Sequence, residues 1–138
     1  MNIEIITNIA AITSGFGTAV LIFRIEHESK MEIDGETVWL PLSDYLILTT
    51  IFSSLALVLV PIFIYPLLVD QYLKFFRAII ALSIVFELGY IFSILAHYRI
   101  IFSGHSSGPR KNPEPPERVI FITTIIFGLL IFALTLLI

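Results

Sequence analysis

Four long runs of apolar residues are the feature that most constrains how this chain folds. They cover residues 5–23, 45–69, 78–98 and 119–138. A bilayer core of roughly 30 Å needs about 20 apolar residues in a helix, and the runs are long enough for that. Lipid offers no partner for backbone amides, so each run must satisfy its own hydrogen bonds as a helix. We therefore expect an all-α integral membrane protein, a four-transmembrane-helix bundle.

The composition agrees with this class and excludes several functions. Of the 138 residues, 57% are hydrophobic and only 14% are charged, against about a quarter charged in soluble domains. The sequence contains no cysteine, which excludes thiolate catalysis and cysteine-ligated metal clusters. A net charge of −3 without a basic, aromatic-rich patch argues against a nucleic acid partner. We expect residues 1–138 to form a single membrane domain without a cofactor.

The distribution of positive charge predicts how the chain is oriented. With four spans, the long loops 24–44 and 99–118 share one side of the membrane, and both termini share the other. Six basic residues lie in the long loops and only two in the middle turn 70–77, namely Arg24, Lys30, Arg99, Arg110, Lys111 and Arg118 against Lys74 and Arg77. The positive-inside rule then places the long loops in the cytoplasm and both termini outside. We expect the plasma membrane of a bacterium or archaeon.

The first long loop contains a predicted β-hairpin. Residues 31–33 and 36–39 flank Asp34-Gly35, a pair typical of a two-residue hairpin turn. We therefore predict a small cytoplasmic β-hairpin between the first two helices. As a functional element it would dock another protein; the alternative is a solvated acidic loop.

Glu87 is an ionisable residue in the middle of an apolar run. It is the tenth residue of the run 78–98, near the middle of the bilayer. A charged group there costs about 2.5–3.5 kcal/mol on insertion scales, so we expect it to face the bundle interior with a partner, or to stay protonated. Helical spacing places it on one face with Ser83, Tyr90 and His97. We interpret this face as a polar seam of the bundle.

The other spans offer small and polar residues that could meet this seam. Residues able to hydrogen-bond with Glu87 are Asn8, Thr50 and Ser54. Residues small enough for close helix contact are Ala11, Gly15, Ala19 and Gly128. Two candidate hinges, each lacking an amide donor, are Pro61 and Pro66.

The three histidines lie at or beyond the membrane boundary on one side. They are His27, His97 and His105, from three separate segments. No spacing such as H-x-x-x-H brings two of them together as metal ligands. We assign no metal site and keep these side chains as the remaining candidates.

Two functions from different classes remain open. The first is a non-enzymatic accessory or anchoring module that binds partner proteins through its cytoplasmic loops. The second is a small oligomeric channel or proton-coupled transporter centred on Glu87. The sequence has no histidine cluster and no nucleophile beside a base, so we expect no enzymatic activity. Expected partners are the lipid bilayer and either further copies of the chain or the subunits of a larger membrane complex.

Overall fold

The part of the chain that the structure describes is helical and has no strand. The computed structural model describes residues 2–33, 41–102 and 113–138. Four of its helical stretches are long and apolar enough to cross a membrane, and they are Ile3–His27, Ser43–Ile64, Asp70–His97 and Pro115–Leu137. This confirms the predicted class and suggests a membrane location.

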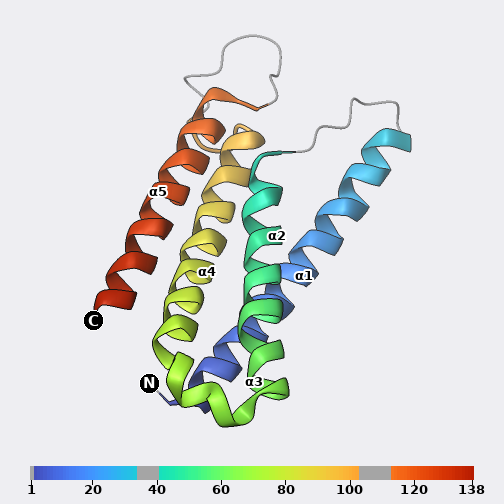
Figure 1. Ribbon diagram of the computed structural model, residues 1–138. Helices are drawn as coiled ribbons and strands as arrows, with labels where there is room; N and C mark the ends of the chain where they lie inside the picture. The colour runs from blue at the N-terminus through green and yellow to red at the C-terminus, as the bar shows by residue number, and fades with distance from the viewer. Residues whose placement is uncertain (1, 34–40, 103–112) are drawn as a thin grey trace.

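The helices run alternately between two ends of the bundle (Figure 1). In chain order they are α1 (Ile3–Ile33), α2 (Ser43–Ser54), the π-helix η1 (Leu55–Leu59), α3 (Val60–Ile64), the 3₁₀ turn η2 (Pro66–Leu68), α4 (Val69–His97) and α5 (Pro115–Leu137). One end, here called the loop end, holds the end of α1, the start of α2, the end of α4 and the start of α5. Both chain termini and the turn between α3 and α4 lie at the opposite end.

Helix α4 is the centre of the bundle and contacts α1, α2 and α5. Helix α5 packs mainly on α4, while the last turns of α1 lean away from the other helices (Figure 1). Two glycines allow α4 and α5 to approach closely. A Cβ atom on Gly89 would overlap Cγ2 of Thr124, and one on Gly128 would lie 2.6 Å from Cε1 of Phe86. Small residues at such contacts are typical of packed membrane helices.

Two apolar clusters fill the contact between α1, the second span and α4. The cluster nearer the termini consists of Ile6, Ala10, Val58, Phe76, Ile79 and Ile80. The cluster nearer the loop end consists of Leu46, Ile47, Phe86 and Tyr90. Because lipid is as apolar as these side chains, their contribution is close packing and not escape from water.

The predicted β-hairpin is wrong in the half that the structure describes. Residues 31–33, expected as its first strand, continue α1 as a helix to Ile33. A salt bridge of 2.8 Å between Lys30 Nζ and Glu26 Oε1, four residues apart, supports these exposed turns. The turn and second strand of the predicted hairpin fall within residues 34–40, outside the described residues.

The turn between the second and third spans lies earlier than predicted. Residues 70–77 are helical, and the helix breaks instead at Tyr65, where φ is −124° and ψ is 58°. The ring of Pro66 disfavours helical backbone at the residue before it. Pro66 therefore marks the end of the span and is not a hinge within it.

Pro61 lies inside a helix, directly after a stretch of π-helix. At the end of η1, the amide of Val60 donates to the carbonyl of Leu55, five residues earlier. Pro61 has no amide with which to continue an α-helical ladder. The wider turn is the local adjustment by which the span accommodates this proline in hydrocarbon.

Candidate functional site

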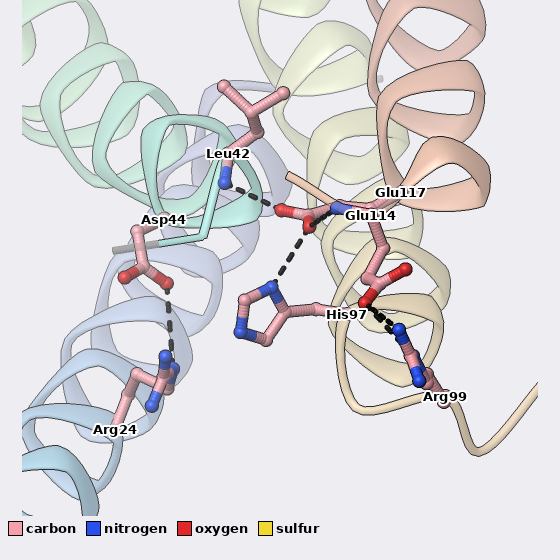
Figure 2. A network of polar contacts seen from close by, with 7 residues as sticks. All are labelled: Arg24, Leu42, Asp44, His97, Arg99, Glu114 and Glu117. Atoms are coloured by element: carbon pink, nitrogen blue, oxygen red, sulfur yellow. Dashed lines mark hydrogen bonds and ion pairs between the residues drawn. The ribbon is translucent and has the colours of Figure 1, made fainter. Parts of the chain in front are cut away.

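Six ionisable side chains gather at the loop end and join all four spans (Figure 2). This loop-end cluster consists of Arg24, Asp44, His97, Arg99, Glu114 and Glu117. All are buried except Arg99, which is partly buried. Buried charges destabilise a fold unless they are paired and hydrogen-bonded, and these form three pairs.

Glu117 is the anchor of the cluster and is fully buried, with 0% of its surface exposed. Its Oε2 lies 2.9 Å from Nδ1 of His97 at the end of α4. Its Oε1 accepts a 2.7 Å hydrogen bond from the amide of Leu42, which precedes α2. One carboxylate from α5 thus holds the ends of two other helices.

Glu117 also fixes where α5 begins. The amide of Glu114 donates to Glu117 Oε2 at 3.2 Å, and the two residues form a capping box around Pro115. The helix therefore starts four residues before the predicted 119, inside the expected loop. The capping box satisfies amides that a helix start otherwise leaves without partners.

Arg99 ends α4 in a conformation that is unusual for arginine. Its φ is 57°, and the amide of Ile100 donates to the carbonyl of Leu95 at 2.9 Å, as in a Schellman cap. A left-handed backbone conformation costs a residue with a Cβ atom roughly 1–2 kcal/mol. The guanidinium lies 2.7 Å from Oε1 of Glu114, and this ion pair offsets the strain.

Arg24 connects α1 to the cluster. Its Nε lies 3.9 Å from Oδ1 of Asp44, and its guanidinium lies 5.3 Å from the centre of the Tyr98 ring. His27 and His97 both contact the same ring edge-on. Arg24 was expected in a solvated loop, but it is a buried side chain that ties α1 to α2 and α4.

A second group, the hydroxyl cluster, lies near the middle of the spans. Its members, all buried, are Thr13, Thr50, Ser53, Ser54 and Ser83. Ser54 Oγ lies 3.0 Å from Thr13 Oγ1 and 3.3 Å from Ser83 Oγ, and Ser53 Oγ lies 3.1 Å from Ser83 Oγ. Thr50 Oγ1 donates to the Ser83 carbonyl at 3.3 Å. The cluster joins α1, α2 and α4, and three of its members were expected in the polar seam.

Glu87 is not part of the hydroxyl cluster. Its side chain is half-buried, and its Oε1 is enclosed without a hydrogen-bond partner among the described residues. Ile80 and Ile94, seven residues before and after it, lie beside α1. Because positions seven apart share a helix face, Glu87 faces the seam between α4 and α1.

The residues of the predicted polar seam therefore do not form one continuous face. Tyr90 is buried in the apolar cluster nearer the loop end, and His97 belongs to the loop-end cluster. Asn8 is exposed on α1; its side chain makes no hydrogen bond within the described part of the chain. Of the seam residues that the structure describes, Thr50 and Ser54 each contact Ser83.

The small residues of α1 face outward. Ala11, Gly15 and Ala19 are exposed, and a Cβ atom on Gly15 would meet nothing within 4 Å. They line a groove beside Leu55 and Leu59. Close contact with α2 is made by another glycine, Gly17, whose Cβ would lie 2.9 Å from Ile51.

A cavity of about 340 Å³ lies between α1 and α4 toward the loop end. Its polar lining consists of Arg24, His27, Tyr90 and Tyr98, and its apolar lining of Val20, Phe23, Ile94 and Leu95. Tyr90 is three residues from Glu87 in the sequence and so lies about one helical turn away from it. Neither Glu87 nor His97 lines the cavity.

The candidate metal ligands do not form a site in the described part of the chain. No group of three or more metal-ligating side chains occurs there. His27 and His97 each contact the Tyr98 ring, and His105 lies outside the described residues.

The loop-end cluster contains the residues that sequence reasoning missed. Glu114, Pro115 and Glu117 carry the signal that could have located it, since an acidic cap, a proline and a glutamate three residues on mark a helix start. The pairing of Arg24 with Asp44 carries no such local signal, because it depends on how α1 and α2 pack.

Comparison of the chain with protein-family models, with curated proteins and with solved structures finds no match.

Proposed function

We propose that this chain is a non-enzymatic membrane module that anchors or accompanies partner proteins through its loops at the loop end. The loop-end cluster is the observation that carries the proposal. Its buried pairs fix the end of α4 and the starts of α2 and α5, from which the two loops depart. Loops held at fixed attachment points lose less conformational entropy when a partner binds. The charge distribution orients this end toward the cytoplasm.

The orientation can be measured directly because the chain has no cysteine. Single cysteines at Asn2 and Ser107 would be probed in intact cells with a membrane-impermeant thiol reagent. Labelling of Asn2→Cys but not of Ser107→Cys is expected. The reverse pattern would place the loops outside.

The anchoring role is tested by exchanging the loops without disturbing the helices. Residues 34–40 and 103–112 are replaced in turn by glycine-serine linkers of equal length. We expect a companion protein that co-purifies in mild detergent with the unaltered chain to be lost in at least one exchange, with the helical circular dichroism unchanged. A chain that purifies without a companion, as a symmetric oligomer, would contradict this function.

We propose as a second candidate a small oligomeric channel or proton-coupled transporter centred on Glu87. The enclosed, unpartnered Oε1 of Glu87 at membrane depth supports it, because ionisable groups there usually belong to ion or proton pathways. In liposomes, the purified chain should move protons or cations, and Glu87→Gln should remove this flux while preserving assembly. Collapse of the fold in Glu87→Gln would instead indicate a structural role that needs the acid itself.

A further inference from the structure

The cavity between α1 and α4 combines two buried polar side chains with two exposed ones. Arg24 and Tyr90 line it and are each 5% exposed, whereas Phe23 and His27 line it and are exposed. Its remaining lining residues are Val20, Ile94, Leu95 and Tyr98. Ligand sites are typically such mostly apolar pockets with a few polar groups. Their volumes are usually about 300–1,000 Å³, and this cavity, at about 340 Å³, lies at the lower end of that range.

The hydroxyl group of Tyr90 makes no hydrogen bond within the described part of the chain. Buried tyrosine hydroxyls usually have a hydrogen-bond partner, which can be a protein group, water or a ligand. Because Tyr90 lines the cavity, a molecule in the cavity can supply that partner. The cavity therefore offers a buried polar group that the fold itself does not use.

The charge of the lining favours an anion. Arg24 carries a permanent positive charge, and none of the described residues that line the cavity is a carboxylate. Asp44, whose Oδ1 lies 3.9 Å from Arg24 Nε, is not among the lining residues. A guanidinium has five N–H donors in a planar fork that matches phosphate, so it can contact a carboxylate and a second acceptor together.

The two donors lie at different depths. The cavity is at the loop end of two candidate membrane spans, Ile3–His27 and Asp70–His97, where helix ends meet the lipid headgroups. The guanidinium of Arg24 lies 5.3 Å from the centre of the Tyr98 ring, just beyond the end of α4. Tyr90 is eight residues earlier, about 12 Å along the helix. A cationic donor thus lies nearer the headgroups and a neutral donor lies deeper.

We propose that this cavity binds the headgroup region of a phospholipid. The guanidinium of Arg24 binds the phosphate, and the hydroxyl of Tyr90 donates to a glycerol-ester carbonyl, which lies deeper in a bilayer than the phosphate. The acyl chains remain in the bilayer. Pockets between membrane helices that carry basic residues are known to bind lipid headgroups. This lipid site goes beyond both proposed functions and depends on neither.

Native mass spectrometry of the full chain in mild detergent, titrated with dioleoyl phosphatidylglycerol, tests the site. Tyr90→Phe removes only the hydroxyl, and Arg24→Lys keeps a positive charge beside Asp44 but loses the planar fork. Each should raise the Kd for one bound lipid at least about 10-fold. The matched controls, Tyr45→Phe and Arg118→Lys, change exposed residues that do not line the cavity and should leave the Kd unchanged. An unchanged Kd in Tyr90→Phe would overturn the inference.

Two further probes distinguish a phospholipid from its parts. Dioleoylglycerol has the same chains and ester groups without the phosphate, and inorganic phosphate has no lipid portion. We expect both to bind at least about 10-fold more weakly than phosphatidylglycerol, because each lacks the acceptor of one donor. Equal binding of dioleoylglycerol would refute recognition of the phosphate. Inorganic phosphate that binds as tightly as the lipid would show a site for free phosphate instead.

Photocrosslinking of the unaltered chain decides if the cavity variants do not fold. The probe is phosphatidylglycerol with a diazirine on the first carbons of one acyl chain, in phosphatidylcholine vesicles. Crosslinks should concentrate in residues 20–27 and 90–98, which contain the lining residues. Crosslinks spread evenly over the four candidate spans would overturn the proposal, since they would indicate ordinary contact with bulk lipid.

Discussion

The end of α4 and the turn that carries Glu87 differ in whether their buried ionisable groups are paired. At the loop end, His97 and Arg99 are each paired with a buried carboxylate from α5. Ten residues earlier, within the third candidate span, Glu87 has its Oε1 enclosed and unpartnered among the described residues. Ser83, one turn before Glu87, is an uncharged polar residue whose hydroxyl forms hydrogen bonds with two serines of α2.

This difference predicts that the paired groups stabilise the fold and that Glu87 does not. A paired buried charge becomes costly only when one partner is removed. An unpaired carboxyl group in hydrocarbon is itself costly, and this cost is the basis of the role proposed for Glu87. Substitutions in α4, α5 and α1 test this distinction.

Glu117→Ala should have the largest effect on stability. It leaves His97 and the Leu42 amide without their acceptor, and removing one partner of a buried pair costs about 3–5 kcal/mol. The measurement is the free energy of unfolding in mixed micelles titrated with a denaturing detergent. Glu117→Gln, which keeps an acceptor for Leu42, is the control and should lose less. Equal losses would mean that the charge of Glu117 alone matters.

Ser83→Ala should have an intermediate effect. It removes the contacts of Ser53 and Ser54, and hydrogen bonds between membrane helices contribute about 0.6 kcal/mol on average and 1.7 at most. The matched control is Ser93→Ala, because Ser93 is equally buried on α4 but its hydroxyl has no partner among the described residues. The same unfolding titration should show a loss for Ser83 and none for Ser93. A loss confined to Ser93 would contradict the hydroxyl cluster.

Glu87→Leu should leave the free energy of unfolding unchanged or raise it. The substitution removes a carboxyl group without breaking a hydrogen bond of the described fold. Size-exclusion chromatography in mild detergent checks that assembly is kept. A destabilisation as large as that of Glu117→Ala would show that Glu87 is a structural residue and would remove the contrast between the two regions.

Lys30→Ala should have the smallest effect. Its salt bridge with Glu26 is exposed to water on both sides, so solvent screens it. Unfolding titrations of Lys30→Ala and of the unaltered chain should coincide. A measurable loss of unfolding free energy would mean that the last turns of α1 contribute to the stability of the bundle.

The sequence predicted the spans well because their evidence is local. Twenty apolar residues in a row need no knowledge of their neighbours to be identified as a membrane helix. The ends of the spans were harder, because they depend on caps and breaks such as those at Tyr65, Arg99 and Glu114. The predicted hairpin failed at residues 31–33, where helix continuation with the Glu26–Lys30 pair prevailed over a short strand signal.

Glu87 shows what periodicity could and could not predict at the candidate site. Its position within the third apolar run, four residues after Ser83, followed from counting residues. Which of these polar groups meet was not predictable, because that depends on the crossing of α1 and α2 over α4.

The lengths of the apolar runs were enough to predict the class of the protein and the number of its candidate spans. These follow from hydrocarbon thickness and from the need of every backbone amide for a partner. Only the tertiary structure decided that Glu117 binds three helix ends, that hydroxyl groups join α1, α2 and α4, and that Glu87 is left without a partner among the described residues. Side chains from segments far apart in the chain meet according to helix packing, and that packing is set by contacts such as Thr124 on Gly89 and Phe86 on Gly128.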